Sequence, residues 1–238
     1  MGASQPRLTI WFGELVTNSQ EMDVGRFITF EGGEGGGKST QTKLLQKSLA
    51  SIGVNSILTR EPGGSTGAEE IRKLIVSGSS DRWDALTELC LLYAARRDHW
   101  LKTIKPNLEK GIWVISDRFA DSSLVYQGYA GDVEIDTALD IHNIVLGDVW
   151  PDLTIVLDLP PEMGLERSMA RDTANNSKDT RFEERELHFH ELLREGFRYL
   201  QNKSPGRISI IDGTKTIKEV ELEVFSLIQK RFNRIILA

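Results

Sequence analysis

Residues 27–40 read FITFEGGEGGGKST, an apolar run that passes into glycines and then into one basic and two hydroxyl residues. The spacing G-x-x-x-x-G-K-[ST] is typical of a phosphate-binding loop, and the residues that match it are Gly32, Gly37, Lys38 and Ser39. Backbone N–H groups of such a loop surround phosphate oxygens, and the N-terminus of the next helix faces their negative charge. Residues 41–50, QTKLLQKSLA, continue with helical spacing, so the stretch predicts a strand, a phosphate loop and a helix.

The loop predicts a site for a nucleotide phosphate with Mg²⁺. We expect Lys38 to reach the β and γ phosphates and the Ser39 hydroxyl to bind Mg²⁺, because the loop amides cannot reach all of the phosphate charge. An ordinary glycine turn is the alternative, but the flanking strand and helix patterns are the context that the motif requires. The expected ATP-binding residues are Gly32, Gly33, Glu34, Gly35, Gly36, Gly37, Lys38, Ser39 and Thr40.

Composition narrows the class of protein. The 238 residues, 39% of them hydrophobic, are enough for one large domain with a full core. The formal net charge of −6 argues against a nucleic acid polymer as partner, since polymer binding needs a basic face. No apolar run approaches the roughly 20 residues that cross a bilayer, so no membrane association is expected. The single cysteine, Cys90, is expected to be buried in a helix, and the protein is expected to be cytoplasmic.

The first 24 residues differ from the rest. Residues 1–24 mix polar residues around one short apolar patch, LTIWFGELV, without the basic start and long apolar core of a secretory signal. We expect a disordered extension that is irrelevant to the chemistry, with Met22 as the functional start and residues 25–238 as a single domain. Loss of activity in a chain that begins at Met22 would contradict this.

Charged residues follow two further predicted strands. Residues 54–59 lead into REPGGSTG, which begins with Arg60, and residues 112–115 lead to Asp117 and Arg118. In open α/β sheets ligands bind at the carboxyl ends of the strands, so Arg60 is a candidate ligand contact; a solvated surface arginine is the alternative. A carboxylate at Asp117 could hold Mg²⁺ directly or through water.

A long helix is predicted for residues 84–104, with Pro106 and Gly111 marking its end. Leu92 and Arg96 lie four residues apart on it, so an apolar surface and a guanidinium could share one pocket. An arginine in water is the alternative. The expected apolar stripe is Leu86, Leu89, Cys90, Tyr93, Arg97, Leu101 and Ile104.

A short helix is predicted for residues 121–129, DSSLVYQGY. Ser123, Tyr126 and Gln127 fall on one face of it, at spacings of three and four. Two hydrogen-bonding groups and a ring that face one way could read a base and a sugar. A polar helix surface capped by Asp121 is an equally good interpretation of the pattern alone.

A loop between two arginines comes next. Residues 172–180, DTANNSKDT, contain no large apolar residue and follow a helix that is expected to end near Arg171. Arg171 and Arg181 flank the loop, which suggests a lid at about 171–182 that closes over an ATP site. An ordinary helix hairpin is the alternative.

The remaining elements alternate between strand and helix. The sequence predicts a capping box at residues 66–69, TGAE, for a helix through Leu74. The histidines show no metal-ligand spacing and are expected to be structural or exposed. The other predicted elements are helices at 136–146 and 217–228 and strands at 153–159 and 208–211.

Several motifs in order resemble the thymidylate kinase family. They are FITFEGGEGGGKSTQ, TREPGG, YAARR, ISDRF, DSSLVYQG and PDLTIVLDLPPEMGLERS, and the resemblance extends from Gly25 to the C-terminal helix. It implies an enzyme that transfers the γ-phosphate of ATP to dTMP and gives dTDP and ADP. It also implies an α/β P-loop NTPase fold, with a five-stranded parallel sheet flanked by helices and a mobile lid.

The resemblance assigns roles to the residues that match its motifs. Arg60 and Arg118 would bind the acceptor phosphate, and Arg96 the thymine edge. The other implied contacts are Glu34 near the sugar 3′-hydroxyl, Ser123 and Gln127 on the base, Tyr126 against the sugar C2′, and Glu183 near the metal and the sugar. Lys38, Arg118 and a lid arginine would be the catalytic residues.

Two positions differ within the family. Another branch carries an arginine where this chain has Gly35, so the resemblance is to the bacterial branch, in which the lid supplies that charge. Arg171 is our choice for this role, with Arg181 as the alternative. Many relatives stack an aromatic ring on thymine at the position of Leu92; here either aliphatic contact or Tyr93 would replace it.

Three other functions remain as alternatives. The first is a kinase of the same fold that acts on another acceptor. Comparing dTMP, dUMP, dCMP and AMP as acceptors would distinguish it. A GTP-binding switch would need Asn-Lys-x-Asp, whereas Asn202-Lys203 continues with Ser204. A non-catalytic ATP-binding module fits poorly with intact Lys38, Ser39 and Asp117. The resemblance also implies a homodimer that uses the helix containing Trp100.

Overall fold

The computed structural model describes residues 25–79, 82–175 and 187–232, with residues 171–175 as backbone only. The extension predicted for residues 1–24 lies outside these ranges. The strands are β1 (Phe27–Glu31), β2 (Ser56–Arg60), β3 (Trp113–Asp117), β4 (Leu153–Asp158) and β5 (Ile208–Asp212). The helices are α1 (Lys38–Ser51), α2 (Thr66–Val76), α3 (Ala85–His99), α4 (Lys105–Leu108), α5 (Ala120–Ser123), α6 (Ile135–Leu146), α7 (Pro161–Asn175), α8 (Leu187–Lys203) and α9 (Ile217–Arg231), with π-helical segments η1 (Trp100–Ile104) and η2 (Leu124–Tyr129).

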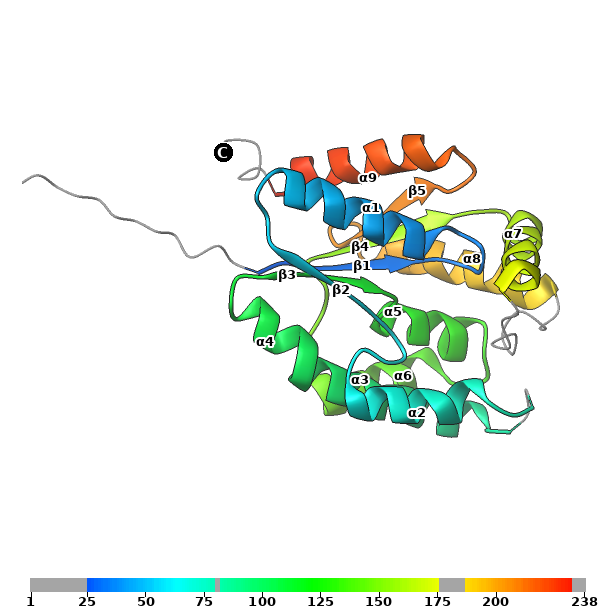
Figure 1. Cartoon of the computed structure of the whole chain (residues 1–238). Helices are drawn as coiled ribbons and strands as arrows, with labels where there is room; N and C mark the ends of the chain where they lie inside the picture. The colour runs from blue at the N-terminus through cyan, green and yellow to red at the C-terminus, as the bar shows by residue number, and fades with distance from the viewer. Residues whose placement is uncertain (1–24, 80–81, 176–186, 233–238) are drawn as a thin grey trace, which may run out of the picture.

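The strands form one parallel sheet in the order β2-β3-β1-β4-β5, which confirms the predicted α/β fold (Figure 1). From the central strand β1 the chain crosses to β2 at one edge, returns to β3, and then passes to β4 and β5 on the other side of β1. Asp117 is aligned with Phe30 of β1 and with Arg60 of β2. This register places the ends of three strands beside the glycine loop that follows β1.

Apolar side chains of β1 alternate between the two faces of the sheet. Ile28 and Phe30 are fully buried in a cluster with Leu45 of α1 and Val224 of α9. Phe27 points the other way, into a second cluster with residues of η1, β3 and α5. Figure 1 shows α1 and α9 over one face and α3 and α6 over the other. Such burial on both faces explains why the parallel strands are almost continuously apolar.

The helix predicted for residues 84–104 runs further than expected and is less regular. Asp84 caps α3 by accepting hydrogen bonds from backbone N–H groups of the first turn. The chain then passes through η1 and α4 and stays helical to Leu108, beyond Pro106. Pro106 lies in the first turn of α4, where the missing N–H and the fixed φ of proline are tolerated.

The apolar stripe predicted for this helix is wrong at its outer positions. Leu86 and Leu101 are 47% and 45% exposed, and Cys90 is exposed rather than buried. Leu89 and Tyr93 are buried as predicted. The neighbouring helices α2 and α6 cover only the narrower stripe, because α3 packs between them at one edge of the molecule.

The capping box predicted at residues 66–69 is also wrong. Ser65 is the N-cap of α2 but makes no capping hydrogen bond; its hydroxyl donates to Asp98 instead. Glu69 accepts the backbone N–H of Gly64. The carboxylate of Glu69 therefore binds the turn after β2 rather than the first turn of α2.

Candidate active site

A cavity of about 380 Å³ opens at the carboxyl ends of β1, β2 and β3. This is the edge where the strand order reverses, the usual ligand position in open α/β sheets. Gly32 and Gly33 line a smaller hollow beside it. The predicted site residues that line the main cavity are Glu34, Gly35, Gly36, Gly37, Lys38, Ser39, Thr40, Arg60, Leu92, Arg96, Asp117, Arg118, Ser123, Tyr126 and Gln127.

The glycines let the loop lie against its neighbours. Gly32, Gly35 and Gly37 have φ values of +126°, +66° and +84°, which side chains rarely adopt. A Cβ on Gly32 would lie 2.5 Å from the carbonyl oxygen of Leu157, and a Cβ on Gly35 only 2.0 Å from that of Gly164. The loop backbone is thus in close contact with β4 on one side and with α7 on the other.

Lys38 and the start of α1 create positive charge at the loop. Lys38 Nζ donates to the carbonyl oxygens of Gly32 and Gly33, at 3.1 and 2.7 Å. Burial lowers the pKa of Lys38, as does the nearby charge of Arg118. The first turn of α1 contains no acidic residue that could offset the positive helix end. These groups together fit a polyphosphate.

Two oxygen atoms beside the loop fit Mg²⁺. Ser39 Oγ donates a hydrogen bond of 2.6 Å to Asp117 Oδ2. Hydroxyl and carboxylate oxygens suit this hard cation, which usually keeps water and phosphate as its other ligands. Across the described ranges no group of three or more His, Cys, Asp or Glu residues could hold a metal ion. Ser39 and Asp117 would therefore share the metal with the nucleotide.

Arg118 is fixed by strong local interactions. Its backbone has φ of +74°, an uncommon value for a residue other than glycine. Its Nη2 donates to Glu34 Oε1 at 2.7 Å, and the Tyr126 hydroxyl donates to the same oxygen at 3.0 Å. Burial alone would raise the pKa of Glu34, but the charges of Arg118 and Lys38 lower it to about 2. Glu34 is therefore an anion that holds the guanidinium over the cavity.

Behind Arg118 lies an acid that the sequence interpretation did not consider. Glu31, fully buried at the end of β1, accepts hydrogen bonds from Phe119 N and Ser122 Oγ at 2.8 and 2.6 Å. Arg118 Nη1 donates to the same hydroxyl, at 3.1 Å. Burial raises the pKa of Glu31 to about 7, although the charge of Arg118 opposes the shift.

The other end of the cavity presents Arg96 and Gln127. Arg96 Nη2 donates to Ser123 Oγ at 3.0 Å, and Gln127 Nε2 donates to Glu88 Oε1 at 2.8 Å. Two buried polar atoms, Arg96 Nη1 and Gln127 Oε1, have no hydrogen-bond partner among the described residues. Buried polar atoms are rarely left unpaired, so this donor and this acceptor point to a ligand.

Of the two residues considered for contact with the base, Leu92 and Tyr93, only one lies at the cavity wall. Leu92 lines the cavity. Tyr93 does not; it is 1% exposed, packs in the core with Leu89, and has the guanidinium of Arg96 at 4.5 Å from its ring centre. An aliphatic contact by Leu92 therefore fits the cavity, and Tyr93 packs behind Arg96.

Arg60 lines the cavity as predicted, but its half-exposed side chain pairs with Glu69 at 3.1 Å.

Several residues of the site were not found from the sequence. Glu61 and Pro62 stand inside the motif REPGG, yet their spacing gave no sign that they face the cavity. The unpredicted lining residues are Glu61, Pro62, Arg72, Ile75, Val76, Phe119 and Ser122.

The predicted lid falls largely outside the described residues. Helix α7 continues to Asn175, so the prediction that it ends near Arg171 is wrong. The side chain of Arg171 is not described, and Arg181 and Glu183 lie outside the described ranges. Their roles stay predictions from the sequence.

Comparison with known proteins gives one consistent family. The family model described as thymidylate kinase matches residues 30–224. A thymidylate kinase of Caulobacter vibrioides is 46% identical over 210 residues, which cover 88% of this chain and 99% of that protein. One of Nitrobacter winogradskyi is 45% identical over 215 residues, 90% of this chain and 93% of that protein. A crystal structure of thymidylate kinase from Ehrlichia chaffeensis superposes with a TM-score of 0.68 at 35% identity, covering 86% of this chain and 99% of that one. Among the described helices none has the length and apolar character needed to cross a membrane.

Proposed function

Because this chain belongs to the thymidylate kinase family, we propose how its described residues divide the work of phosphorylating dTMP. The enzyme transfers a phosphoryl group from ATP to dTMP. An oxygen of the dTMP phosphate attacks the γ-phosphorus of ATP, that bond forms, and the bond to the β-phosphate oxygen breaks to release ADP. The attacking oxygen is already anionic, so catalysis requires positioning and charge neutralisation rather than a base.

Lys38 and Arg118 would neutralise the phosphates together, since both donate to the Gly32 carbonyl and so lie side by side. The ammonium of Lys38 has three protons, and two of them donate to loop carbonyls, so one remains for the β and γ phosphates. Arg118 is anchored by Glu34 and Ser122 with its guanidinium at the cavity wall, where it would bind the acceptor phosphate. Arg60 would join it after leaving its exposed ion pair with Glu69, which costs little because such pairs are weak.

Mg²⁺ would bind between Ser39 and Asp117 when ATP is present. Bound there, it would neutralise charge that develops on the transferring group. The two side chains already share a hydrogen bond at 2.6 Å, so the ligand oxygens are in place. The residues that hold the nucleotide would be those of the loop from Gly32 to Thr40.

Arg171 is our proposal for the arginine that completes the charge. A side chain at Gly35 would collide with the Gly164 carbonyl, so an arginine cannot come from that loop position. Residue 171 lies seven positions beyond Gly164, that is two turns or about 10 Å further along the same face of α7. This position on the face of α7 that meets the loop supports the choice of Arg171.

The unpaired donor Arg96 Nη1 and the unpaired acceptor Gln127 Oε1 would bind the base. That these two buried atoms lack a partner is the observation that carries the assignment of dTMP to this cavity. Because the carboxylate of Glu88 can only accept, Gln127 must turn Nε2 toward it and Oε1 away. Arg96 Nη1 then suits the O4 acceptor of thymine, and Gln127 Oε1 suits its N3–H donor. Cytosine presents a donor and an acceptor in reversed order, which leaves buried groups unpaired.

Coupled ADP release with different acceptors tests this reading. With ATP and Mg²⁺, we expect dCMP to react about 10⁴-fold less efficiently than dTMP, because a site built for hydrogen bonds rejects a mismatched partner strongly. dUMP lacks only a methyl group and should lose about 10- to 200-fold. Comparable kcat/KM for dTMP and dCMP would refute the proposed roles of Arg96 and Gln127.

A cytoplasmic homodimer is the remaining proposal. Exposed apolar side chains occur on adjacent helices at one edge of the molecule, and they include Leu74 of α2, Leu86 of α3 and Ile144 of α6, the last 83% exposed. Trp100 begins η1, directly after α3. Light scattering on the native protein and on Ile144→Glu tests it; a native mass of one chain would contradict the dimer.

A further inference from the structure

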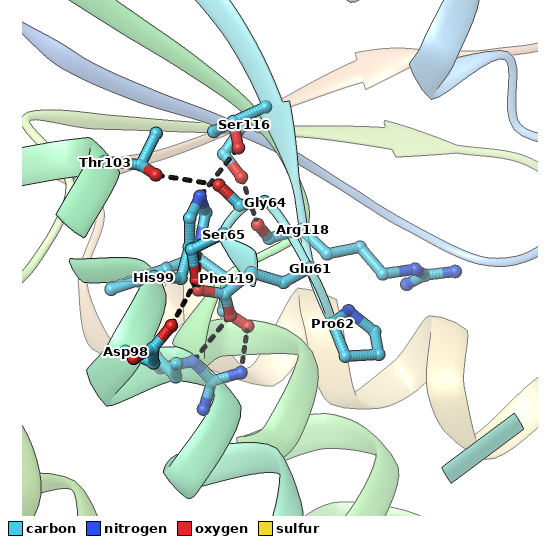
Figure 2. Close-up of polar contacts among 12 residues, drawn as sticks. Glu61, Pro62, Gly64, Ser65, Asp98, His99, Thr103, Ser116, Arg118 and Phe119 are labelled. Atoms are coloured by element: carbon cyan, nitrogen blue, oxygen red, sulfur yellow. Dashed lines mark hydrogen bonds and ion pairs between the residues drawn. The ribbon is translucent and has the colours of Figure 1, made fainter. Parts of the chain in front are cut away.

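A buried chain of hydrogen bonds stands behind Arg96 (Figure 2). Glu61 Oε2 accepts from Arg96 Nε at 2.7 Å, and Glu61 Oε1 lies 2.9 Å from His99 Nδ1. His99 Nε2 lies 2.6 Å from the hydroxyl of Thr59. The side chains of Glu61, Arg96 and His99 are 4%, 2% and 0% exposed. An acid, a base and an arginine are thus shielded from water without touching the phosphate loop.

Glu61 is the charged member that balances Arg96. Burial alone would raise the pKa of Glu61, but Arg96 and then His99 lower it, so the group is a carboxylate. Because a carboxylate can only accept, His99 Nδ1–H donates to it, while His99 Nε2 lies within hydrogen-bond distance of the Thr59 hydroxyl. Both oxygens of the Glu61 carboxylate then accept from a buried donor.

The fold brings these residues together from two elements. Thr59 lies in β2 and Glu61 follows the strand directly, while Arg96 and His99 are three residues apart on one face of α3. The turn after β2 is held against this helix, since the Thr103 hydroxyl donates to the Gly64 carbonyl at 2.7 Å. Figure 2 shows Gly64 and Ser65 of this turn beside His99.

Three contacts fix the direction of the guanidinium. Besides Glu61, Arg96 Nη2 donates to Ser123 Oγ and to the Phe119 carbonyl, at 3.0 and 3.1 Å. Only Glu61 carries charge among these partners, and only Glu61 contacts Nε, the atom nearest the flexible stem. With Nε and Nη2 both held, the plane of the guanidinium is set, and so is the direction of the unpaired Nη1.

We propose that Glu61 and His99 are positioning residues for base recognition: Glu61 holds the guanidinium of Arg96 in the plane that meets the base, and His99 holds Glu61. Neither residue touches the reacting phosphates. This inference rests on the proposed contact of Arg96 with the base, and it adds that the contact depends on Glu61 at the cavity wall and on His99 behind it.

The substitution Glu61→Gln tests the first residue, because the amide keeps the shape but removes the charge and leaves one acceptor oxygen where the carboxylate has two. We expect the KM for dTMP to rise roughly 10- to 100-fold, the value of a lost hydrogen bond to a charged group, with kcat changed less than about threefold. The inhibition constant of 2-deoxyribose 5-phosphate, which has the phosphate and sugar but no base, should stay within about twofold of wild type. An equal loss for both compounds would indicate general damage to the site and would overturn the proposal.

A double-mutant cycle separates this inference from the proposed function. In an Arg96→Met background, Glu61→Gln should cause no further rise in the KM for dTMP, because residues that act through one another are not additive. If Arg96→Met itself leaves the KM unchanged, the role of Arg96 in base recognition fails. If Arg96→Met raises the KM but Glu61→Gln in the wild-type background does not, only the positioning role fails.

His99 provides a second route if Glu61→Gln does not fold. His99→Leu should raise the KM for dTMP roughly three- to tenfold, a smaller effect since Glu61 keeps Arg96 as partner. His99→Gln should restore it, because an amide N–H can still donate to Glu61. Asp98→Asn, next to His99 on α3 and bonded to Ser65 rather than to Arg96, is the matched control and should leave the KM unchanged. Equal effects of Leu and Gln at position 99, or an effect of Asp98→Asn as large as that of His99→Leu, would overturn the role of His99.

Discussion

The substitution Glu31→Gln should change how stability depends on pH. Glu31 is fully buried, and its pKa is raised from 4.5 to about 7, chiefly by burial. The folded chain therefore binds a proton more tightly than the unfolded chain does. Stability linked to Glu31 is fully present below about pH 4.5 and is lost as the pH rises through about 7.

The size of the effect follows from the two pKa values. A difference of about 2.5 units corresponds to about 3.4 kcal/mol over the whole range, at about 1.4 kcal/mol per unit. Between about pH 5 and about pH 8 the free energy of unfolding of the wild type should fall by about 2.5 kcal/mol relative to Glu31→Gln, because part of the titration lies below pH 5. Glutamine cannot titrate, yet its amide can still accept from Phe119 N and donate to Ser122.

Urea denaturation of both proteins, without nucleotide, at about four pH values in this range measures the difference. Only the change of the difference with pH matters, so a constant loss of stability in the variant does not affect the reasoning. Parallel curves for the two proteins, or a difference that grows in favour of the wild type with rising pH, would refute the assignment of a raised pKa to Glu31.

Three further predictions concern residues at the edge of the site or away from it. Arg171→Ala should lower kcat by about 10³-fold or more with little change in the KM for dTMP; near-normal turnover excludes this arginine. Gly164→Ala places a Cβ 2.4 Å from the Glu34 carbonyl oxygen, so the KM for ATP should rise at least about tenfold. Gly206→Ala is the control and should be neutral, because a Cβ at position 206 meets no atom within 4 Å. Steady-state kinetics of both variants measures the difference. Cys90 is exposed in the single chain but lies one helical turn from Leu86 on the face proposed for the dimer, so a thiol reagent should titrate one thiol per chain once the dimer is dissociated, and Cys90→Ser should keep full activity; a thiol that reacts only after denaturation contradicts this exposure.

The phosphate loop was predictable from the sequence because its chemistry is local. The spacing from Gly32 to Ser39 demands a defined backbone path, and the flanking strand and helix patterns supply its frame. The family motifs similarly located Arg96, Arg118 and Gln127, and the structure brings all three to one cavity. In each case a short stretch of sequence already contained the groups that act together.

Features that depend on packing between distant segments were not predictable. Glu31 becomes a buried acid only because Phe119 and Ser122, about 90 residues away, fold over it. Cys90 is exposed because neighbouring helices cover one stripe of α3 and leave another open, which periodicity alone cannot decide. Glu69 fits the pattern of a capping box, yet the turn after β2 takes its carboxylate. A local pattern cannot show which distant group competes for a side chain.

The contact between Gly35 and Gly164 limits which substitutions evolution could accept. A carbonyl 2.0 Å from any Cβ at position 35 excludes every other amino acid there while α7 keeps its present path. A larger residue in the loop would require α7 to move in the same step or beforehand, because the obstacle is a backbone carbonyl rather than a side chain. The identity of residue 35 and the path of α7 are therefore coupled, although the two lie about 130 positions apart in the chain.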